Sequence, residues 1–250
     1  LPAFTIISCG NAIVRAGLIP VLVDSDPHTF NMRADAILKR ITKKTKAIMV
    51  VHIYGLPCDM DPIIAIAKTH KLKIIEDAAE MHGQEYNGQK CGSFGDVSTF
   101  SFYPNKHITT GEGGMVVTDD PLLAERARSF RNLCFGQKNR YEHDELGWNF
   151  RMTNLQAAVG LAQLERIDSA VSRKRQIGRY YQNELANIPG VSLPLESTAY
   201  AENIYWVFTL LLSVGYRQAL PEILSQLGDL GVGTRRFFKP LHQQPVYKEM

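Results

Sequence analysis

The sequence predicts an α/β fold: a three-layer sandwich with a mostly parallel central sheet, followed by the start of a smaller α+β C-terminal domain. Strand-like and helix-like segments alternate over the first half of the chain, which is typical of a parallel sheet covered by helices. A near-continuous apolar run at residues 46–54 indicates a strand buried on both faces. Beyond Pro189 this alternation ends, and an apolar strand at residues 204–212 precedes a helix at residues 221–230.

The N-terminal half has a local signal for each element. Gly17 closes a short first helix, and Asp61 with Pro62 supplies the N-cap and first position of a third one. The expected helices are residues 11–17, 34–41 and 63–70, and the expected strands are residues 20–24, 46–54 and 73–77.

The middle of the chain begins with Asn87 and Gly88, the strongest short hairpin signal in the sequence. Pro121 opens a helix that we expect to end near residue 131. Residues 136–145 are polar and have no apolar periodicity, so they predict an exposed and mobile loop.

Thr153 and Gln156 form a capping box that starts a long helical pattern, with a bend, to about residue 186. So long a helix usually bridges two domains, and we place the boundary near residue 170. This gives a large domain at residues 1–170 and a small domain at residues 171–250. Because Leu1 lies in what resembles the end of a strand, we expect the large domain to lack its N-terminal part and the small domain to be truncated.

The composition argues against several classes of protein. The 250 residues are 45% hydrophobic, enough for one large core, and a net charge of +3 without a dense basic run does not indicate nucleic-acid binding. No apolar run reaches the roughly 18 residues of a membrane span. The four widely spaced cysteines could form two disulfides, but reduced thiols and a cytoplasmic location are favoured. The histidines show no metal-ligand spacing, so no metal site is expected.

Lys106 is the first candidate for chemistry. Residues 99–103 alternate between apolar and polar side chains as a strand does, and Pro104 ends that strand. Lys106 then lies in a turn, ahead of a glycine-rich stretch and a strand at residues 115–118. By itself this pattern favours a solvated loop lysine in a glycine-rich turn.

A second segment favours the functional interpretation of Lys106. The apolar strand at residues 73–77 ends in Glu76 and Asp77, and small residues follow. An acid at the carboxyl end of one strand, near a lysine at the end of another, is the pair that a pyridoxal phosphate enzyme needs. For Asp77, a helix N-cap is the ordinary alternative.

Several motifs together resemble the DegT/DnrJ type of pyridoxal phosphate-dependent, fold-type I aminotransferases, which act on nucleotide-linked keto sugars. The resemblance covers essentially the whole chain and is closest to the perosamine synthase-like branch. It is carried by residues 2–5 with 11–12, 76–79 with 82–83, 95–96, 101–106 with 110–114, 147–151 with 156–158, and 240–242.

The resemblance implies a role for two residues in catalysis. Lys106 would be the Schiff-base lysine, a nucleophilic amine that also moves a proton as a general base and acid. Asp77 would keep the pyridine nitrogen of the cofactor protonated. Glu80 stands where the family often has a glutamine on the oxygen side of the ring.

The resemblance also implies cofactor contacts outside this pair. The Ser101 hydroxyl would donate to the cofactor phosphate, although a strand serine is more often inert. Asn149 would reach the phosphate in a neighbouring subunit, which implies a homodimer with shared active sites; a simple turn residue is the alternative. Ile6 takes the position of the usual aromatic residue over the ring and covers it with weaker geometric control. The family's phosphate-binding loop would precede Leu1.

The implied function is transfer of the amino group of L-glutamate to a nucleotide-linked keto-deoxy sugar. In the perosamine branch this substrate is GDP-4-keto-6-deoxymannose, and the product enters O-antigen or other surface polysaccharide. Two alternatives stay open. A sugar dehydratase of the same fold has histidine at the lysine position, which Lys106 argues against, and a non-catalytic pyridoxal phosphate-binding regulator is the other. His82 and His242 are interpreted as structural or substrate-edge residues, His107 as a loop residue, and Arg151 as a possible surface charge.

Overall fold

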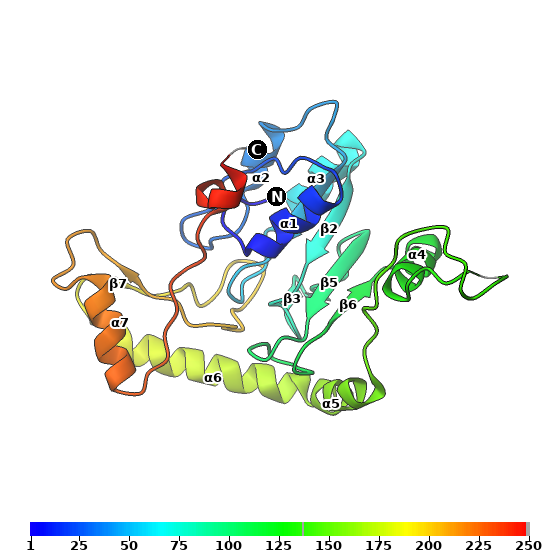
Figure 1. Ribbon diagram of the computed structural model, residues 1–250. Coiled ribbons are helices and arrows are strands. Elements are labelled where there is room, and N and C mark those ends of the chain that lie inside the picture. The colour runs from blue at the N-terminus through cyan, green and yellow to red at the C-terminus, as the bar shows by residue number, and fades with distance from the viewer. Residues whose placement is uncertain (137, 249–250) are drawn as a thin grey trace.

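A four-stranded sheet in the order β1-β2-β5-β6 forms the centre of the computed structural model, which describes residues 1–136 and 138–248 (Figure 1). The strands are β1 (Ala47–Val51), β2 (Lys73–Asp77), β5 (Val97–Ser101) and β6 (Gly114–Val117). The first three are parallel, and β6 runs antiparallel to β5. The predicted mostly parallel sheet is therefore confirmed.

Helices cover both faces of the sheet, because neighbouring residues of β1 point into two separate cores. Val50 packs into a core with α2 (Ala34–Leu38) and α3 (Met60–His70). Val51 packs into another core with α1 (Ile7–Arg15). This alternation of side chains across a strand produces the predicted three-layer sandwich.

Two helices begin earlier than their sequence signals indicate. Helix α1 starts at Ile7 because Cys9 and Gly10, which are weak helix formers, are buried there by tertiary packing. Helix α3 starts at Met60, so Asp59 and not Asp61 occupies the N-cap position. The Asp59 carboxylate accepts a hydrogen bond from the Tyr86 hydroxyl at 2.7 Å and caps no backbone amide.

Two predicted strands are wrong over most of their length. In residues 20–24, only Val23 forms a β-bridge, to Pro2. In residues 204–212, only β8 (Leu211–Leu212) is a strand, and it pairs with β7 (Val191–Ser192). Tyr205 has a φ of 46°, which an extended strand excludes. The apolar residues 204–206 are instead buried in a loop.

The predicted hairpin is confirmed. It joins β3 (Glu85–Tyr86) to β4 (Gln89–Lys90) through two residues of positive φ, Asn87 at 49° and Gly88 at 80°. In the predicted exposed loop, residues 138–145 are exposed and form neither helix nor strand. Gln137 and residues 249–250 lie outside the described residues, and the mobility of this loop stays a prediction.

The long helical pattern forms two helices with a break at Arg166. Thr153 and Gln156 form the predicted capping box at the start of α5 (Asn154–Leu164), and α6 (Ile167–Leu185) continues along one side of the molecule (Figure 1). The remaining helices are α4 (Pro121–Arg131), α7 (Leu220–Asp229), η1 (Leu241–Gln243) and η2 (Pro245–Tyr247). A domain boundary at residue 170 would fall inside α6 and stays a prediction.

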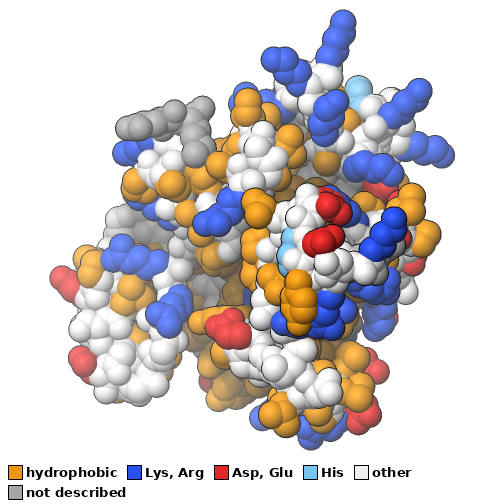
Figure 2. Space-filling view, turned by 45° about the vertical axis from the view of Figure 1, so that its right-hand side comes forward, with side chains coloured by type: hydrophobic (Ala, Val, Ile, Leu, Met, Phe, Trp, Pro, Cys, Tyr) orange, Lys and Arg blue, Asp and Glu red, His pale blue; other side chains and the backbone are white. Residues whose placement is uncertain are grey.

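Helix α5 presents apolar side chains to the surface. Leu155 is 82% exposed, Val159, Leu161 and Leu164 are each more than half exposed, and no residue of the helix is buried. Phe150, just before the helix, is 72% exposed. Figure 2 turns the side of the molecule that carries α4 and α5 toward the viewer, and it shows hydrophobic side chains among the charged ones there. Apolar surface gathered in this way is typical of a protein interface.

Within the described part of the chain, no helix combines the length and the apolar character needed to cross a bilayer. The four cysteines are free, as predicted, and all four are buried.

Candidate active site

Lys106 is not a solvated loop lysine. It lies in the turn that follows β5, where its backbone N–H donates to the carbonyl of Tyr103 at 3.0 Å. Only 10% of its side chain is exposed. The turn therefore directs the amine into the protein.

Two acidic residues lie near this amine. Glu80 Oε1 is 3.8 Å from Lys106 Nζ, and Glu80 Oε2 accepts a hydrogen bond from the backbone N–H of Tyr54 at 2.7 Å. Asp77 ends β2 at the centre of the sheet, paired in register with Val51 and Thr99, and its charge acts on the Lys106 amine. The structure thus brings Lys106, Asp77 and Glu80 to the carboxyl edge of the sheet, where ligands of such folds bind.

Asp77 does not cap a helix, so that alternative is wrong. Its Oδ1 accepts from the backbone N–H of Ala79 at 3.0 Å in a turn, and no helix starts there. Its Oδ2 accepts from the Cys9 thiol at 3.1 Å. The carboxylate is half-buried and is oriented by contacts from two different elements.

Burial controls the electrostatics of this group. It lowers the pKa of Lys106, while the charges of Glu80 and Asp77 partly oppose that effect. Burial raises the pKa of Glu80, against the attraction of the Lys106 charge and the Tyr54 N–H. A lysine whose pKa is lowered has more of the neutral, nucleophilic amine at a given pH.

The other predicted contact residues surround this group less directly. Ser101 ends β5, and its hydroxyl accepts from the backbone N–H of Tyr103 at 3.2 Å. Ile6 occupies the N-cap position of α1 and is 38% exposed. Asn149 is exposed, and its side chain accepts from Arg151 Nε at 2.9 Å. Among the described residues, no hydrogen bond, ion pair or cation–π contact joins Ile6 or Asn149 to Lys106.

Two histidines, His82 and His107, lie close enough to the Lys106 amine for its charge to act on them. His82 is buried against the rings of Phe100 and Phe102, and neither of its ring nitrogens has a hydrogen-bond partner among the described residues. Burial lowers the pKa of both His82 and His107 to about 4. Both imidazoles are therefore neutral near pH 7. His107 lies in a loop, as predicted, but it is part-buried, and its Nε2 is 3.3 Å from the carbonyl oxygen of Ile204. His242 lies in η1 at the surface, away from these contacts.

Sequence reasoning missed two contacts of the site. Trp206 places its ring 3.8 Å from Lys106 Nζ, but it belongs to the apolar run that predicted a strand. Cys9 was considered only as a thiol, although it donates to Asp77. The spacing of neither residue signals its contact, because each partner comes from a distant part of the chain.

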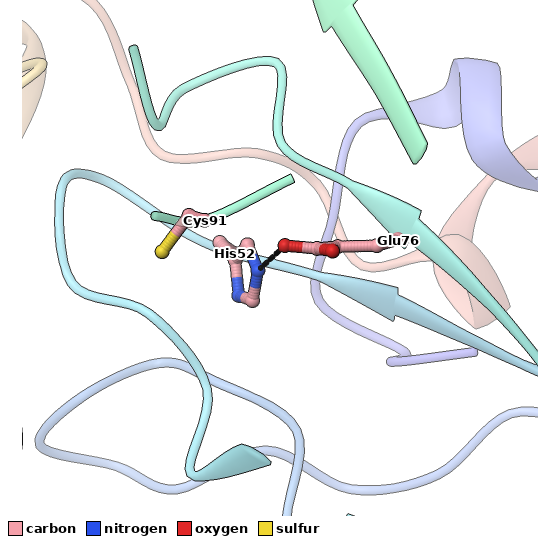
Figure 3. A group of neighbouring side chains, drawn as sticks. All are labelled: His52, Glu76 and Cys91. Carbon is pink, nitrogen blue, oxygen red and sulfur yellow. Dashed lines mark hydrogen bonds and ion pairs between the residues drawn. The ribbon is translucent and has the colours of Figure 1, made fainter. Parts of the chain in front are cut away.

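A second buried cluster, on the opposite side of β2 from Asp77, consists of His52, Glu76 and Cys91 (Figure 3). His52 Nδ1 accepts from the backbone N–H of Cys58 at 3.0 Å, so the other ring nitrogen, Nε2, carries the proton and donates to Glu76 Oε1 at 3.0 Å. Both ring nitrogens are therefore engaged.

Glu76 is also fully engaged. Its two oxygens accept from three backbone N–H groups and one hydroxyl, those of Gly92, Phe94, Gly95 and Ser98. Burial raises the pKa of the Cys91 thiol, so the sulfur stays protonated and is a poor metal ligand. This donor set does not suit a metal ion. The hydrogen bonds of Glu76 instead hold residues 92–98 against β2.

The mixed α/β fold with its mostly parallel central sheet is that of the pyridoxal phosphate-dependent sugar aminotransferases, whose solved structures superpose with TM-scores up to 0.92. Comparison with known proteins specifies the group further. The chain belongs to the DegT/DnrJ/EryC1/StrS aminotransferase family, whose model matches residues 1–250.

Individual relatives are similar over the whole chain. GDP-perosamine synthase of Caulobacter vibrioides is 42% identical over 250 residues, and that of Escherichia coli O157:H7 is 43% identical over 249 residues. Each alignment covers 100% of this chain and 67% of the relative. The solved structure of S. venezuelae DesV superposes with a TM-score of 0.89 at 35% identity, covering 100% of this chain and 66% of DesV. The chain therefore spans about two thirds of the length of the relatives that it matches.

Proposed function

We propose that this protein is a pyridoxal phosphate-dependent aminotransferase that moves the amino group of L-glutamate to a nucleotide-linked keto-deoxy sugar. The observation that carries the proposal is the buried Lys106 amine beside Glu80 and Asp77. Similarity to two GDP-perosamine synthases favours GDP-4-keto-6-deoxymannose as the substrate and GDP-perosamine as the product. We place this reaction in the cytoplasm, in the synthesis of O-antigen or another surface polysaccharide.

The residues present fit this cofactor. When bound, pyridoxal phosphate supplies an electron sink for the charge left on the α carbon of the amino donor. The Asp77 carboxylate would hold the proton on the ring nitrogen, and its bond from Cys9 keeps it oriented. Lys106 would bind the cofactor covalently. Once released, its amine would carry a proton between the α carbon of the amino donor and the C4′ carbon of the cofactor. Glu80 would hold the amine in place, Ser101 would donate to the phosphate, and Ile6 would cover one face of the ring.

The functional test is the visible absorbance of the full-length protein with pyridoxal phosphate. A lysine-linked cofactor gives a visible band, and we expect L-glutamate to bleach it and GDP-4-keto-6-deoxymannose to restore it with release of GDP-perosamine. A panel with UDP- and TDP-linked keto sugars would identify the nucleotide. A band that ignores every amino donor would contradict the proposal and favour the regulator; loss of water from the sugar without amination would favour the dehydratase.

The apolar surface of α5 supports a homodimer. Asn149 precedes the first residue of α5 by five positions, so in a dimer formed through α5 it would lie next to the interface. We propose that the two copies share their active sites, and that Asn149 of one copy contacts the cofactor phosphate held by the other.

Mixing two inactive variants tests the shared site. A heterodimer of Lys106→Ala and Asn149→Ala chains would have one site with both residues intact, so we expect mixing to restore up to half of the wild-type activity per heterodimer. The measurement is activity after the two purified variants are unfolded together and refolded, with each variant refolded alone as the control. If Asn149 acts within its own chain, mixing will restore nothing.

A further inference from the structure

The Lys106 amine has an aromatic partner as well as an acidic one. Its Nζ lies 3.8 Å from the ring centroid of Trp206 and 3.8 Å from Glu80 Oε1. A cation over an indole is stabilised by the negative face of the ring, and the effect is larger when water is excluded. Both Lys106 and Trp206 are about nine-tenths buried here.

The Trp206 ring is fixed in this position by its neighbours. Its Nε1 donates to the carbonyl of Asn105, the residue before Lys106, at 2.9 Å. Its own carbonyl accepts from Lys174 Nζ at 3.1 Å, and its ring stacks on Tyr54 with centroids 6.1 Å apart. The ring therefore contacts both the lysine amine and the turn that carries it, from a segment 101 positions away from Asn105.

We propose that Trp206 is a positioning residue that holds the free, protonated amine of Lys106 between its ring and the Glu80 carboxylate. On the proposed function, this contact sets the pH at which the lysine can act as a nucleophile, because the ammonium must lose its proton before it attacks. The neutral amine gains little from the ring face, so Trp206 favours the charged form.

The other groups around the amine are the same in each variant proposed below. Glu80 and Asp77 favour the charged form. His82 and His107, whose own pKa values are lowered to about 4 by burial and by neighbouring positive charge, are neutral in this pH range and add no charge of their own. The Lys174 amine donates its hydrogen bond to the backbone carbonyl of Trp206, not to the indole ring. A change made only to the electron density of the indole ring therefore isolates the contribution of Trp206.

The test measures the pH dependence of Lys106 labelling in the full-length protein freed of cofactor. The rate of labelling by an amine reagent, trinitrobenzenesulfonate, is followed by peptide mass spectrometry. Tryptophan at position 206 is replaced by mono-, di- and trifluorotryptophan, which weaken the negative face of the ring but keep its size and its Nε1 donor. We expect the labelling midpoint to move to lower pH step by step, by about 0.5–1 unit over the series. A midpoint that does not change would overturn the proposal.

Two further variants separate the charge effect from simple support of the turn. The same fluorinated residues at Trp148, which is 50% exposed, are the matched control and should leave the midpoint unchanged. Trp206→Phe retains a ring but loses the bond to Asn105, so it should lower the midpoint less than Trp206→Leu, and equal shifts would mean that the turn alone matters. No cofactor or substrate takes part, so failure here would leave the glutamate test of the function untouched, and failure of that test would leave this result standing.

Discussion

Lys106→Ala is expected to abolish the visible absorbance band formed with pyridoxal phosphate and to reduce aminotransferase activity by at least about 10²–10⁴-fold, the usual contribution of a positioned acid–base group. Alanine removes both the nucleophile and the proton carrier of the site. Lys106 is held 3.8 Å from Glu80 in a turn that directs its amine inward, so the variant leaves no amine at that position. The measurements are the absorbance spectrum and the rate of product formation.

The matched control for this variant is Lys68→Ala. Lys68 lies on α3 and is exposed. We expect it to keep the band and the activity of the wild type. Full turnover by the Lys106→Ala protein would show that the amine is not required and would end the proposed assignment.

Glu76→Gln is expected to destabilise the fold by about 3–5 kcal/mol, the usual cost of breaking a buried, charged hydrogen-bond network. Glu76 is fully buried and accepts all of its hydrogen bonds from donors of residues 52 and 92–98. The amide of glutamine would turn two N–H donors toward groups that are themselves donors, and neither side could reach water. The measurement is the free energy of unfolding in urea at pH 7.

Glu85→Gln is the control for that loss. Glu85 pairs with Lys90 at 2.8 Å, but both side chains are about half exposed, so removing the pair should cost no more than about 1 kcal/mol. Because Glu76 immediately precedes Asp77, we also expect Glu76→Gln to weaken cofactor binding. If the two variants have equal stability, the cluster in Figure 3 is not the anchor of β2 that the contacts indicate.

Local sequence signals predicted those parts of the fold that local chemistry controls. The bounds of β2 and α4, the hairpin at Asn87 and the capping box at Thr153 were all predicted, because turn geometry and capping act over a few residues. The strand predicted at residues 204–212 was wrong because apolar character alone does not distinguish a strand from a buried loop.

The candidate site was predicted in part for the same reason. The sequence identified Lys106 and Asp77 because one follows a strand and the other ends a strand of the same sheet, and carboxyl ends of parallel strands meet at one edge. Glu80 was identified only through the family resemblance. The sequence could not identify Trp206 or Cys9, whose contacts depend on how distant segments pack. A contact of this kind has no signature in local spacing.

The most direct test of the central claim is to find the lysine that bonds to the cofactor. Sodium borohydride added to the full-length protein with pyridoxal phosphate makes that bond permanent, and peptide mass spectrometry then locates the pyridoxyl group. We predict that the group is found on Lys106 and that the Asp77→Asn protein is labelled at the same residue with weaker cofactor affinity. A pyridoxyl group on any other lysine, or on none, would contradict the account.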